Sequence, residues 1–235
     1  MTSELKQTFK CNYCERSFAR ESTLAVHVCE QKKRFQHKDD PASRMAFQSY
    51  IKFYEIAQGS AKSKTFDDFA TSAYYKAFIK FANYCVNARV INTIRFTEWL
   101  LKNNKRIDYW GSDKIYDEFL KEYIYRENAT DALTRALETS LDWSEEAGAP
   151  SEDFLRHGNT NKLCQYISSG KLTGWTIFNC PTGHDLLENL NQEQIAMVYD
   201  FINPDRWSKI LRDYPGDTEY MKEMLGKAGD RKSVV

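Results

Sequence analysis

The chain has 235 residues, and its 33 lysines and arginines balance 33 aspartates and glutamates. This length allows one sizeable core with a small additional module, and a net charge of zero excludes a protein that binds polyanions over its whole surface. Charge is nevertheless uneven, because residues 1–38 contain eight lysines and arginines against four glutamates. We therefore expect contacts with phosphate to concentrate at the N-terminal end.

The N-terminal segment has a spacing typical of a small ββα unit built around one zinc ion. Six residues define it: Phe9, Cys11, Cys14, Phe18, Leu24 and His27. The two cysteines would place thiolates on a tight turn, and the histidine would close the site from the end of a short helix. The apolar residues would form the small core that metal binding stabilises. The pattern therefore predicts a structural zinc site.

The fourth zinc ligand stays open between two residues. The spacing resembles that of the zinc-finger family with two cysteine and two histidine ligands, in which the second histidine follows the first by a gap of three to five residues. Here those positions are Gln31, Lys32 and Lys33, and none of these binds zinc. Cys29 can complete the site if the helix ends just before it, and His37 can do so if the linker folds back. We expect Cys29.

The same resemblance implies how the finger would contact DNA. The candidate DNA-binding residues are Arg16, Arg20, Thr23, Lys32, Lys33 and Arg34. If the finger docks as that family does, Arg20, Thr23 and Val26 occupy the base-reading positions, and the remaining cations contact phosphate. One finger covers only about three base pairs, which is too little to address a genomic site. We therefore expect it to recognise a DNA structure or to dock on a protein.

The rest of the chain is predicted to be helical. A charged linker near residue 40 separates the finger from aromatic and aliphatic residues at helical spacing, such as Phe47, Tyr50, Ile51 and Tyr54. We expect a mainly α protein with a ββα zinc finger and basic tail at residues 1–38, a helical subdomain at 41–149 and a second one at 150–228. Thr65 and Ser112 are expected to begin helices, and Gly59 and Gly148 to end them.

Three stretches of the helical body carry more specific expectations. Between Tyr74 and Phe81 aromatic residues alternate with lysines, as on surfaces that bind single strands. The spacing favours a core helix instead, with Tyr74, Phe78, Phe81 and Cys85 on its buried face and the lysines on another. Leucines at positions 133, 137 and 141 continue the apolar face of a helix, and Gly148 and Pro150 are expected to end it. The run from Trp175 to Phe178 is rich in β-forming residues and is expected to interrupt the second helical subdomain.

No catalytic motif is recognisable in the sequence. The best remaining group is Cys180-Pro-Thr-Gly-His184, which is more typical of a turn before a helix that starts near His184 than of a thiolate pair. We therefore expect a protein that is not an enzyme. The scattered cysteines favour a reducing compartment, and no apolar run approaches 18 residues, so the sequence predicts a soluble, intracellular protein.

A broader resemblance follows from the segment between Phe9 and Arg34, with its Phe-x-Cys-x-Tyr-Cys and His-x-Cys-Glu-x-Lys-Lys-Arg motifs. This segment, followed by an aromatic helical body, resembles a group of zinc-finger proteins encoded by T-even-type tailed phages of marine bacteria. That resemblance implies the cytoplasm of an infected bacterial host. The order of aromatic helices is also similar to that of phage helicase-loading proteins, which bind forked and single-stranded DNA and contact the replicative helicase and the single-strand binding protein.

These expectations lead to two hypotheses of different classes. The first is a zinc-dependent, non-enzymatic DNA-binding accessory factor of phage replication or recombination, acting on duplex or forked DNA in the manner of a helicase loader. The alternative is a protein-interaction adaptor whose finger docks on RNA polymerase or another host factor to regulate transcription. A third class, an enzyme centred on Cys180 and His184, is the least supported by the residues.

Overall fold

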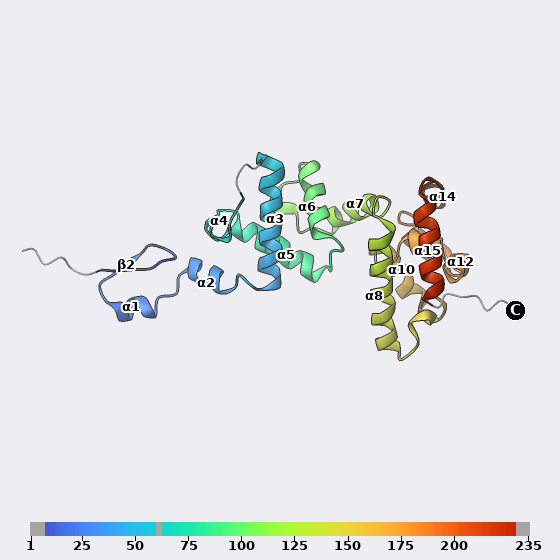
Figure 1. Cartoon of the computed structure of the whole chain (residues 1–235), viewed down its shortest axis with the longest axis horizontal. Helices are drawn as coiled ribbons and strands as arrows, with labels where there is room; N and C mark the ends of the chain where they lie inside the picture. Colours follow the sequence, from blue (N-terminus) through green and yellow to red (C-terminus); the bar gives the residue numbers. More distant parts are fainter. Residues whose placement is uncertain (1–7, 60–62, 229–235) are drawn as a thin grey trace, which may run out of the picture. The chain divides into compact units, whose positions relative to one another are not determined.

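The computed structural model describes residues 8–59 and 63–228. The chain divides into two compact units, Met1–Tyr116 and Asp117–Val235, called unit 1 and unit 2 below. Helices make up most of both units, and the strands in the described residues form one small sheet at the N-terminal end, so the predicted mainly α fold with an N-terminal ββα element is confirmed (Figure 1).

The N-terminal element of unit 1 is a β-hairpin followed by two short helices. Strands β1 (Phe9–Lys10) and β2 (Ser17–Phe18) pair in antiparallel fashion, with Phe9 opposite Phe18. Helix α1 (Glu21–Ala25) is only five residues long, and α2 (Glu30–Gln36) follows after a short turn. Neither helix contains a fully buried residue. Packing alone therefore gives this element little stability.

The remainder of unit 1 is a helical bundle, and its local signals are largely those expected. Its elements are α3 (Pro41–Gln58), α4 (Phe66–Thr71), α5 (Tyr75–Asn87), α6 (Thr93–Lys102), η1 (Ile107–Tyr109) and α7 (Asp113–Tyr123), which continues into unit 2. Helix α3 packs on α5 and α6 (Figure 1). Thr65 begins α4 through a capping box with Asp68, and Gly59 ends α3 at a φ of 56°.

The core of unit 1 is aromatic and differs from the prediction by one residue. Its largest fully buried side chains are Phe69, Phe78, Phe81, Phe96 and Trp110. In α5 it is Tyr75 that is buried, whereas Tyr74 precedes the helix and is exposed. The predicted core position at Tyr74 is therefore wrong. The spacing from residue 75 to 78 matches one helical turn as well as the spacing from 74 to 78 does, so the sequence alone could not separate them.

Besides the end of α7, the regular elements in the described residues of unit 2 are all helices. They are α8 (Ala129–Ala147), η2 (Ser151–Asp153), α9 (Phe154–His157), α10 (Thr160–Ser168), α11 (Gly174–Ile177), α12 (Pro181–Glu188), α13 (Gln192–Val198), α14 (Pro204–Asp213) and α15 (Pro215–Lys227). Gly148 ends α8 at a φ of 63°, but η2 and α9 then pack back on α8 within the same unit. The break near residue 150 ends a helix without separating two units.

The core of unit 2 explains why two local expectations were wrong. The run expected to be β-forming is helix α11, and it brings Trp175 against Trp207 with ring centroids 5.7 Å apart. Gly174 lies so close to the Trp207 indole that an added Cβ would come within 2.2 Å of it, so tertiary packing selects the helix here. Leu141 of α8, expected to be a core residue, is exposed, and Ala136 and Trp143 are among the buried residues instead.

A buried ion pair in unit 2 joins the start of α8 to the segment just before that helix. The side chain of Glu127 is fully buried, and Arg135 donates to both of its carboxylate oxygens at 2.7 and 2.8 Å. Arg135 also donates from Nε to the carbonyl of Gly170 at 2.7 Å. Burial raises the pKa of Glu127 to about 7, even though the guanidinium opposes this shift. The pair therefore fixes α8 to the loop before α11 at a cost in desolvation.

Candidate metal centre

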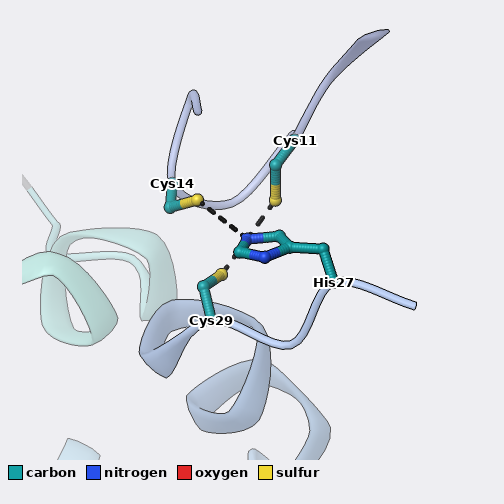
Figure 2. A group of neighbouring side chains, drawn as sticks. All are labelled: Cys11, Cys14, His27 and Cys29. Atoms are coloured by element: carbon teal, nitrogen blue, oxygen red, sulfur yellow. Dashed lines mark hydrogen bonds between the residues drawn. The ribbon is translucent and has the colours of Figure 1, made fainter. Parts of the chain in front are cut away.

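Four side chains near the N-terminus converge on one point. The Sγ atoms of Cys11, Cys14 and Cys29 and a ring nitrogen of His27 lie within 4.8 Å of one another (Figure 2). Cys11 is buried and the other three are half-buried. No other group of three or more such ligand residues was found in residues 8–59 and 63–228. These four residues can hold a metal ion.

The distances fit a tetrahedral site with three sulfur ligands and one nitrogen. Zinc binds thiolates at about 2.3 Å and imidazole at about 2.0 Å, so tetrahedral geometry places two sulfur ligands about 3.8 Å apart and a sulfur and a nitrogen about 3.5 Å apart. The Sγ atoms of Cys11 and Cys29 are 4.0 Å apart, and Cys14 Sγ lies 3.3 Å from His27 Nε2. The donor set and its spacing are therefore consistent with zinc.

The knuckle between β1 and β2 presents the first two thiols. The backbone N–H of Cys11 donates to the carbonyl of Arg16, and the N–H of Glu15 donates to the carbonyl of Cys11, both at 2.9 Å. Closing this turn places Glu15 at a φ of 60°, in the left-handed region that costs a side-chain-bearing residue free energy. The turn is thus locally strained, and a metal bound by Cys11 and Cys14 would offset that strain.

Backbone amides prepare the Cys11 thiol for coordination. Hydrogen bonds from the backbone N–H groups of Cys14 and Tyr13 lower the pKa of Cys11. The backbone N–H of Arg16 also lowers the pKa of Cys14, but burial and the neighbouring thiols outweigh it and raise this pKa. Because a metal binds thiolates, Cys11 is the thiol of this pair that ionises more readily.

The other two ligands come from the turn between α1 and α2. Helix α1 ends at Ala25, earlier than expected, so His27 lies beyond the helix with its ring 4.7 Å from that of Phe18. Cys29 is the N-cap of α2, and its Sγ accepts a hydrogen bond from the backbone N–H of Lys32 at 3.4 Å. The structure thus places Cys29 in the cluster by ending α1 before residue 26.

The alternative ligand lies elsewhere. His37 caps the other end of α2, where its Nδ1 lies 2.9 Å from Asp40 Oδ2. It is not part of the four-residue cluster. Because α2 continues to Gln36 as a regular helix, the linker does not fold back toward the knuckle as a histidine ligand at this position would require.

The residues predicted to contact DNA fall into two groups. Arg16, Arg20, Thr23 and Lys33 are exposed. Within the described residues, none of the three cations in this group forms an ion pair, although the Arg16 guanidinium lies 5.7 Å from the Phe18 ring. Lys32 is half-buried and donates from Nζ to the carbonyl of His27 at 3.3 Å. Four of the six predicted residues therefore remain accessible.

Arg34 belongs to the interior of unit 1. Its side chain is only 13% exposed, and it donates from Nη1 to the carbonyl of Ala70 at 2.6 Å. The guanidinium also lies 4.3 Å from the centroid of the Tyr75 ring and 3.5 Å from Glu30. These contacts with α4 and α5 leave Arg34 unsuited to the phosphate contact predicted for it.

Phe35 joins the finger to the helical bundle, and sequence analysis missed it. Its ring lies 5.2 Å from that of Tyr13 in the cysteine knuckle and 5.5 Å from that of Phe66 in α4. The next ring in this series is Phe47 of α3, 5.5 Å from Phe66. The signal in the sequence was a single aromatic residue inside a segment that otherwise looks like a charged linker. The finger therefore packs on the bundle through α2.

The cysteine and histidine considered for catalysis lie at the start of α12. Cys180 is buried, and α12 begins directly after it, with Pro181 at its first position. His184 therefore lies within the helix instead of at its start, and its Nε2 is 3.1 Å from the carbonyl oxygen of Phe178. The proline–threonine–glycine segment is the first turn of the helix, so the predicted turn before it is wrong.

Charge separates the two units sharply. Unit 1 contains 20 lysines and arginines against 12 aspartates and glutamates, a net charge of +8, and unit 2 contains 13 against 21, a net charge of −8. The excess of positive charge therefore extends beyond the finger into the helical bundle of unit 1. A balanced total charge hides this division.

Comparison with known proteins identifies no relative of this chain. No protein-family model, no curated protein and no solved structure matches the chain. Within the described residues, no helix is both long enough and apolar enough to span a membrane. The functional argument therefore depends on the metal cluster, the exposed side chains and the division of charge.

Proposed function

We propose that this protein is a non-enzymatic DNA-binding accessory factor of phage replication or recombination, in which a zinc ion orders the finger. The ion would be held by Cys11, Cys14, His27 and Cys29, three thiolates and an imidazole, which is a closed structural set without an open catalytic position. Bound zinc supplies folding free energy to an element that has almost no buried core.

The observation that carries this proposal is the charge of the unit that contains the cluster. Unit 1 has a net charge of +8, and three of its exposed cations lie on or beside the finger: Arg16, Arg20 and Lys33. Cations without a nearby carboxylate are available to neutralise phosphates, and each such contact releases counterions from DNA. A unit with this excess of positive charge is suited to a polyanionic partner.

The short α1 favours recognition of DNA shape over recognition of a long sequence. Five helical residues rise only about 7.5 Å, so the helix offers few side chains to a major groove. Arg20 directly precedes α1 and can make a bidentate contact with guanine, while Thr23 and Val26 offer at most one hydrogen bond and an apolar contact. Affinity then comes mainly from phosphates, as at a fork or junction.

The phage setting of this proposal derives from the resemblance of the Phe9 to Arg34 segment to proteins of T-even-type phages. The same reasoning proposes a place in the cytoplasm of the infected host and the replicative helicase or single-strand binding protein as partners. The acidic unit 2 is compatible with a protein partner, because its charge opposes direct contact with DNA.

A gel-shift experiment with forked DNA at two salt concentrations tests the proposal. We expect the zinc-loaded full chain to bind, and the double substitution Arg16→Ala with Arg20→Ala to lower the slope of log K against log salt by about 0.9 for each duplex phosphate that the finger no longer neutralises. Arg206→Ala with Lys209→Ala, two exposed cations of α14 in unit 2, is the matched control and should bind as the unaltered chain does. A shift that persists unchanged in the finger variant would refute the finger as the DNA contact.

One observation favours the adaptor as a second candidate. Val26 is 77% exposed and Val28 is 54% exposed, on the turn that carries His27. Two exposed aliphatic side chains beside a zinc site can form the apolar centre of a small protein contact, with RNA polymerase or another host factor as the proposed partner. Absence of any DNA shift near physiological salt, together with retention of RNA polymerase that is abolished in Val26→Asp, would favour this candidate.

A further inference from the structure

An open hollow lies on the finger, beside the candidate metal cluster. Its volume is about 170 Å³, and both Cys11 and His27 line it. Cys14 and Cys29 are not among its lining residues, so the hollow is a space next to the four ligands and not the point on which they converge. The DNA contacts proposed above do not use it. Six further residues line it: Lys10, Asn12, Tyr13, Leu24, Ala25 and Lys32.

The hollow is positively charged. Lys10 of β1 and Lys32 of α2 line it, and its lining residues include no carboxylate. Lys32 is half-buried and donates to the carbonyl of His27 at 3.3 Å, so its ammonium group is held in place with further N–H donors left for a ligand. The exposed ion pair of Lys10 with Glu15, at 3.6 Å, stabilises little. An anion is therefore the expected occupant.

The ring of Tyr13 is both accessible and held in place. Tyr13 is 41% exposed, although its ring lies 5.2 Å from that of Phe35, which in turn contacts Phe66 of the bundle. A ring held by its neighbours loses little conformational freedom when a ligand stacks on it. Exposed aromatic side chains next to cations bind unpaired nucleobases, because every base has a face that can stack. The hollow thus combines a group for a base with groups for its phosphates.

The size of the hollow and its remaining wall suit a single base. A water molecule needs about 10–15 Å³ of such volume, so the hollow has room for roughly eleven non-hydrogen atoms or more, about the number in a purine base. Leu24 and Ala25 line it with apolar groups, and Asn12 has an amide that can donate and accept hydrogen bonds, as the edge of an unpaired base can. Inside a duplex, pairing and stacking cover both the edge and the face of each base.

We propose that the hollow binds an unpaired nucleotide next to the duplex of a DNA fork, with its base stacked on Tyr13 and its phosphates held by Lys10 and Lys32. This inference rests on the proposed DNA binding by the finger and names what distinguishes a fork from a duplex. Arg16 and Arg20 can hold duplex phosphates whether or not the strands separate, whereas only separated strands deliver a base to the hollow. Since a single strand has a lower charge density than a duplex, electrostatics alone would not favour the fork.

Two DNA molecules and the zinc-loaded full chain test the proposal by fluorescence anisotropy: a fork and a fully paired duplex with the same number of phosphates. We expect the fork to bind about fivefold to a hundredfold more tightly, as stacking of one base contributes. 2-Aminopurine at the unpaired position next to the duplex should lose fluorescence on binding, because stacking on tyrosine quenches it. Equal affinity for the two DNA molecules, or absence of quenching, would overturn this proposal alone. No binding of either would overturn the proposed function as well.

Variants of Tyr13 locate the stacked base. Tyr13→Phe keeps the ring and should retain the preference for the fork. Tyr13→Leu removes the ring and should lower this preference to less than about twofold, with no change in affinity for the duplex. A competitive zinc titration identifies a variant that no longer orders the finger, and quenching by the unaltered chain then carries the test. A preference for the fork that persists in zinc-loaded Tyr13→Leu would place the base elsewhere and overturn the proposal.

Lys10→Gln tests the phosphate contact. It should lower the slope of log K against log salt for the fork by about 0.7, the value for one single-strand phosphate, and leave the slope for the duplex unchanged. Lys114→Gln is the matched control, because this exposed lysine of α7 belongs to unit 1 and does not line the hollow. A heptaglutamate peptide should compete with the fork about tenfold less well than heptathymidylate, since it has no bases to stack. Equal competition would overturn the proposal and assign the hollow to an acidic segment of a protein.

Discussion

The two units of this chain obtain their stability in different ways. The N-terminal element of unit 1 has two helices without a buried residue and brings three thiols and an imidazole together instead. Unit 2 has a core around Trp175 and Trp207 and a fully buried carboxylate held by an arginine. A short element that cannot bury enough apolar surface needs a metal or another cross-link, whereas a unit of more than 100 residues does not. Loss of metal and loss of packing should therefore affect different parts of the molecule.

Charge follows the same division. Unit 1 carries +8 and unit 2 carries −8, so their partners are expected to differ in charge. Within unit 1, α2 links the finger to the bundle, because the thiol of Cys29 caps its first turn and Arg34 and Phe35 lie in its last turn. The metal site and the aromatic bundle are therefore coupled through one short helix.

Removing the metal should change this protein more than any single substitution in unit 2. Structural zinc contributes an apparent 10–16 kcal/mol in finger peptides, so a strong chelator should unfold the finger while unit 2 stays folded. Hydrogen exchange measured by mass spectrometry should show reduced protection at residues 8–36 and unchanged protection in α8. Cys29→Ser should release zinc, and His37→Ala, the matched control, should retain it. Zinc retained by the first variant and released by the second would show that the fourth ligand lies in the linker.

The next largest effect should come from breaking the buried ion pair of unit 2. Arg135→Met leaves the buried carboxylate of Glu127 without its partner, which should cost about 3–5 kcal/mol of unfolding free energy near pH 8. Burial already raises the pKa of Glu127 to about 7, above its value of 4.5 in the unfolded chain. Protonated Glu127 therefore adds its full contribution to the free energy of unfolding below about pH 4.5, and this contribution is lost as pH rises through 7. The cost of Arg135→Met should therefore be clearly smaller at pH 5 than at pH 8.

Urea unfolding followed by hydrogen exchange in α8 measures this difference. Arg156→Met removes an exposed arginine that lies 3.5 Å from Asp153, and as the matched control it should cost less than about 1 kcal/mol at either pH. An equal cost of Arg135→Met at pH 5 and pH 8 would mean that Glu127 does not titrate in this range.

A smaller effect should appear at the joint between the finger and the bundle. Phe35 is half-buried between Tyr13 and Phe66, so Phe35→Ala should cost about 1–2 kcal/mol, less than a fully buried phenylalanine. We expect zinc affinity to change little, while protection from hydrogen exchange in α2 falls. Tyr109→Ala, at an exposed aromatic residue of η1, serves as the control. Unchanged protection of α2 would show that Phe35 does not hold the finger on the bundle.

Much of this arrangement could be predicted from local patterns, and the remainder depends on tertiary contacts. The spacing from Phe9 to His27 predicted the ββα element, because a metal knuckle and its apolar residues lie close together in the sequence. The sequence could only favour Cys29 over His37 as the fourth ligand. The choice depends on where α1 ends, and the structure ends it at Ala25. The interior position of Arg34 depends on Ala70 and Tyr75, more than 30 residues away, and no local pattern contains that information.

The smallest effect tests whether the cysteine knuckle is strained. Glu15 has a φ of 60°, and glycine adopts this conformation without the steric cost that a Cβ imposes. Glu15→Gly should therefore stabilise the zinc-bound finger by about 0.5–1 kcal/mol, which corresponds to a gain in zinc affinity of about two- to fivefold. The exposed pair of Glu15 with Lys10, at 3.6 Å, is removed at little cost. Arg89→Gly relieves a φ of 50° after α5 and is the matched control, since it should stabilise the bundle without changing zinc affinity. A competitive zinc titration of both variants separates the two effects, and weaker zinc binding by Glu15→Gly would mean that the side chain, not the backbone, supports the knuckle.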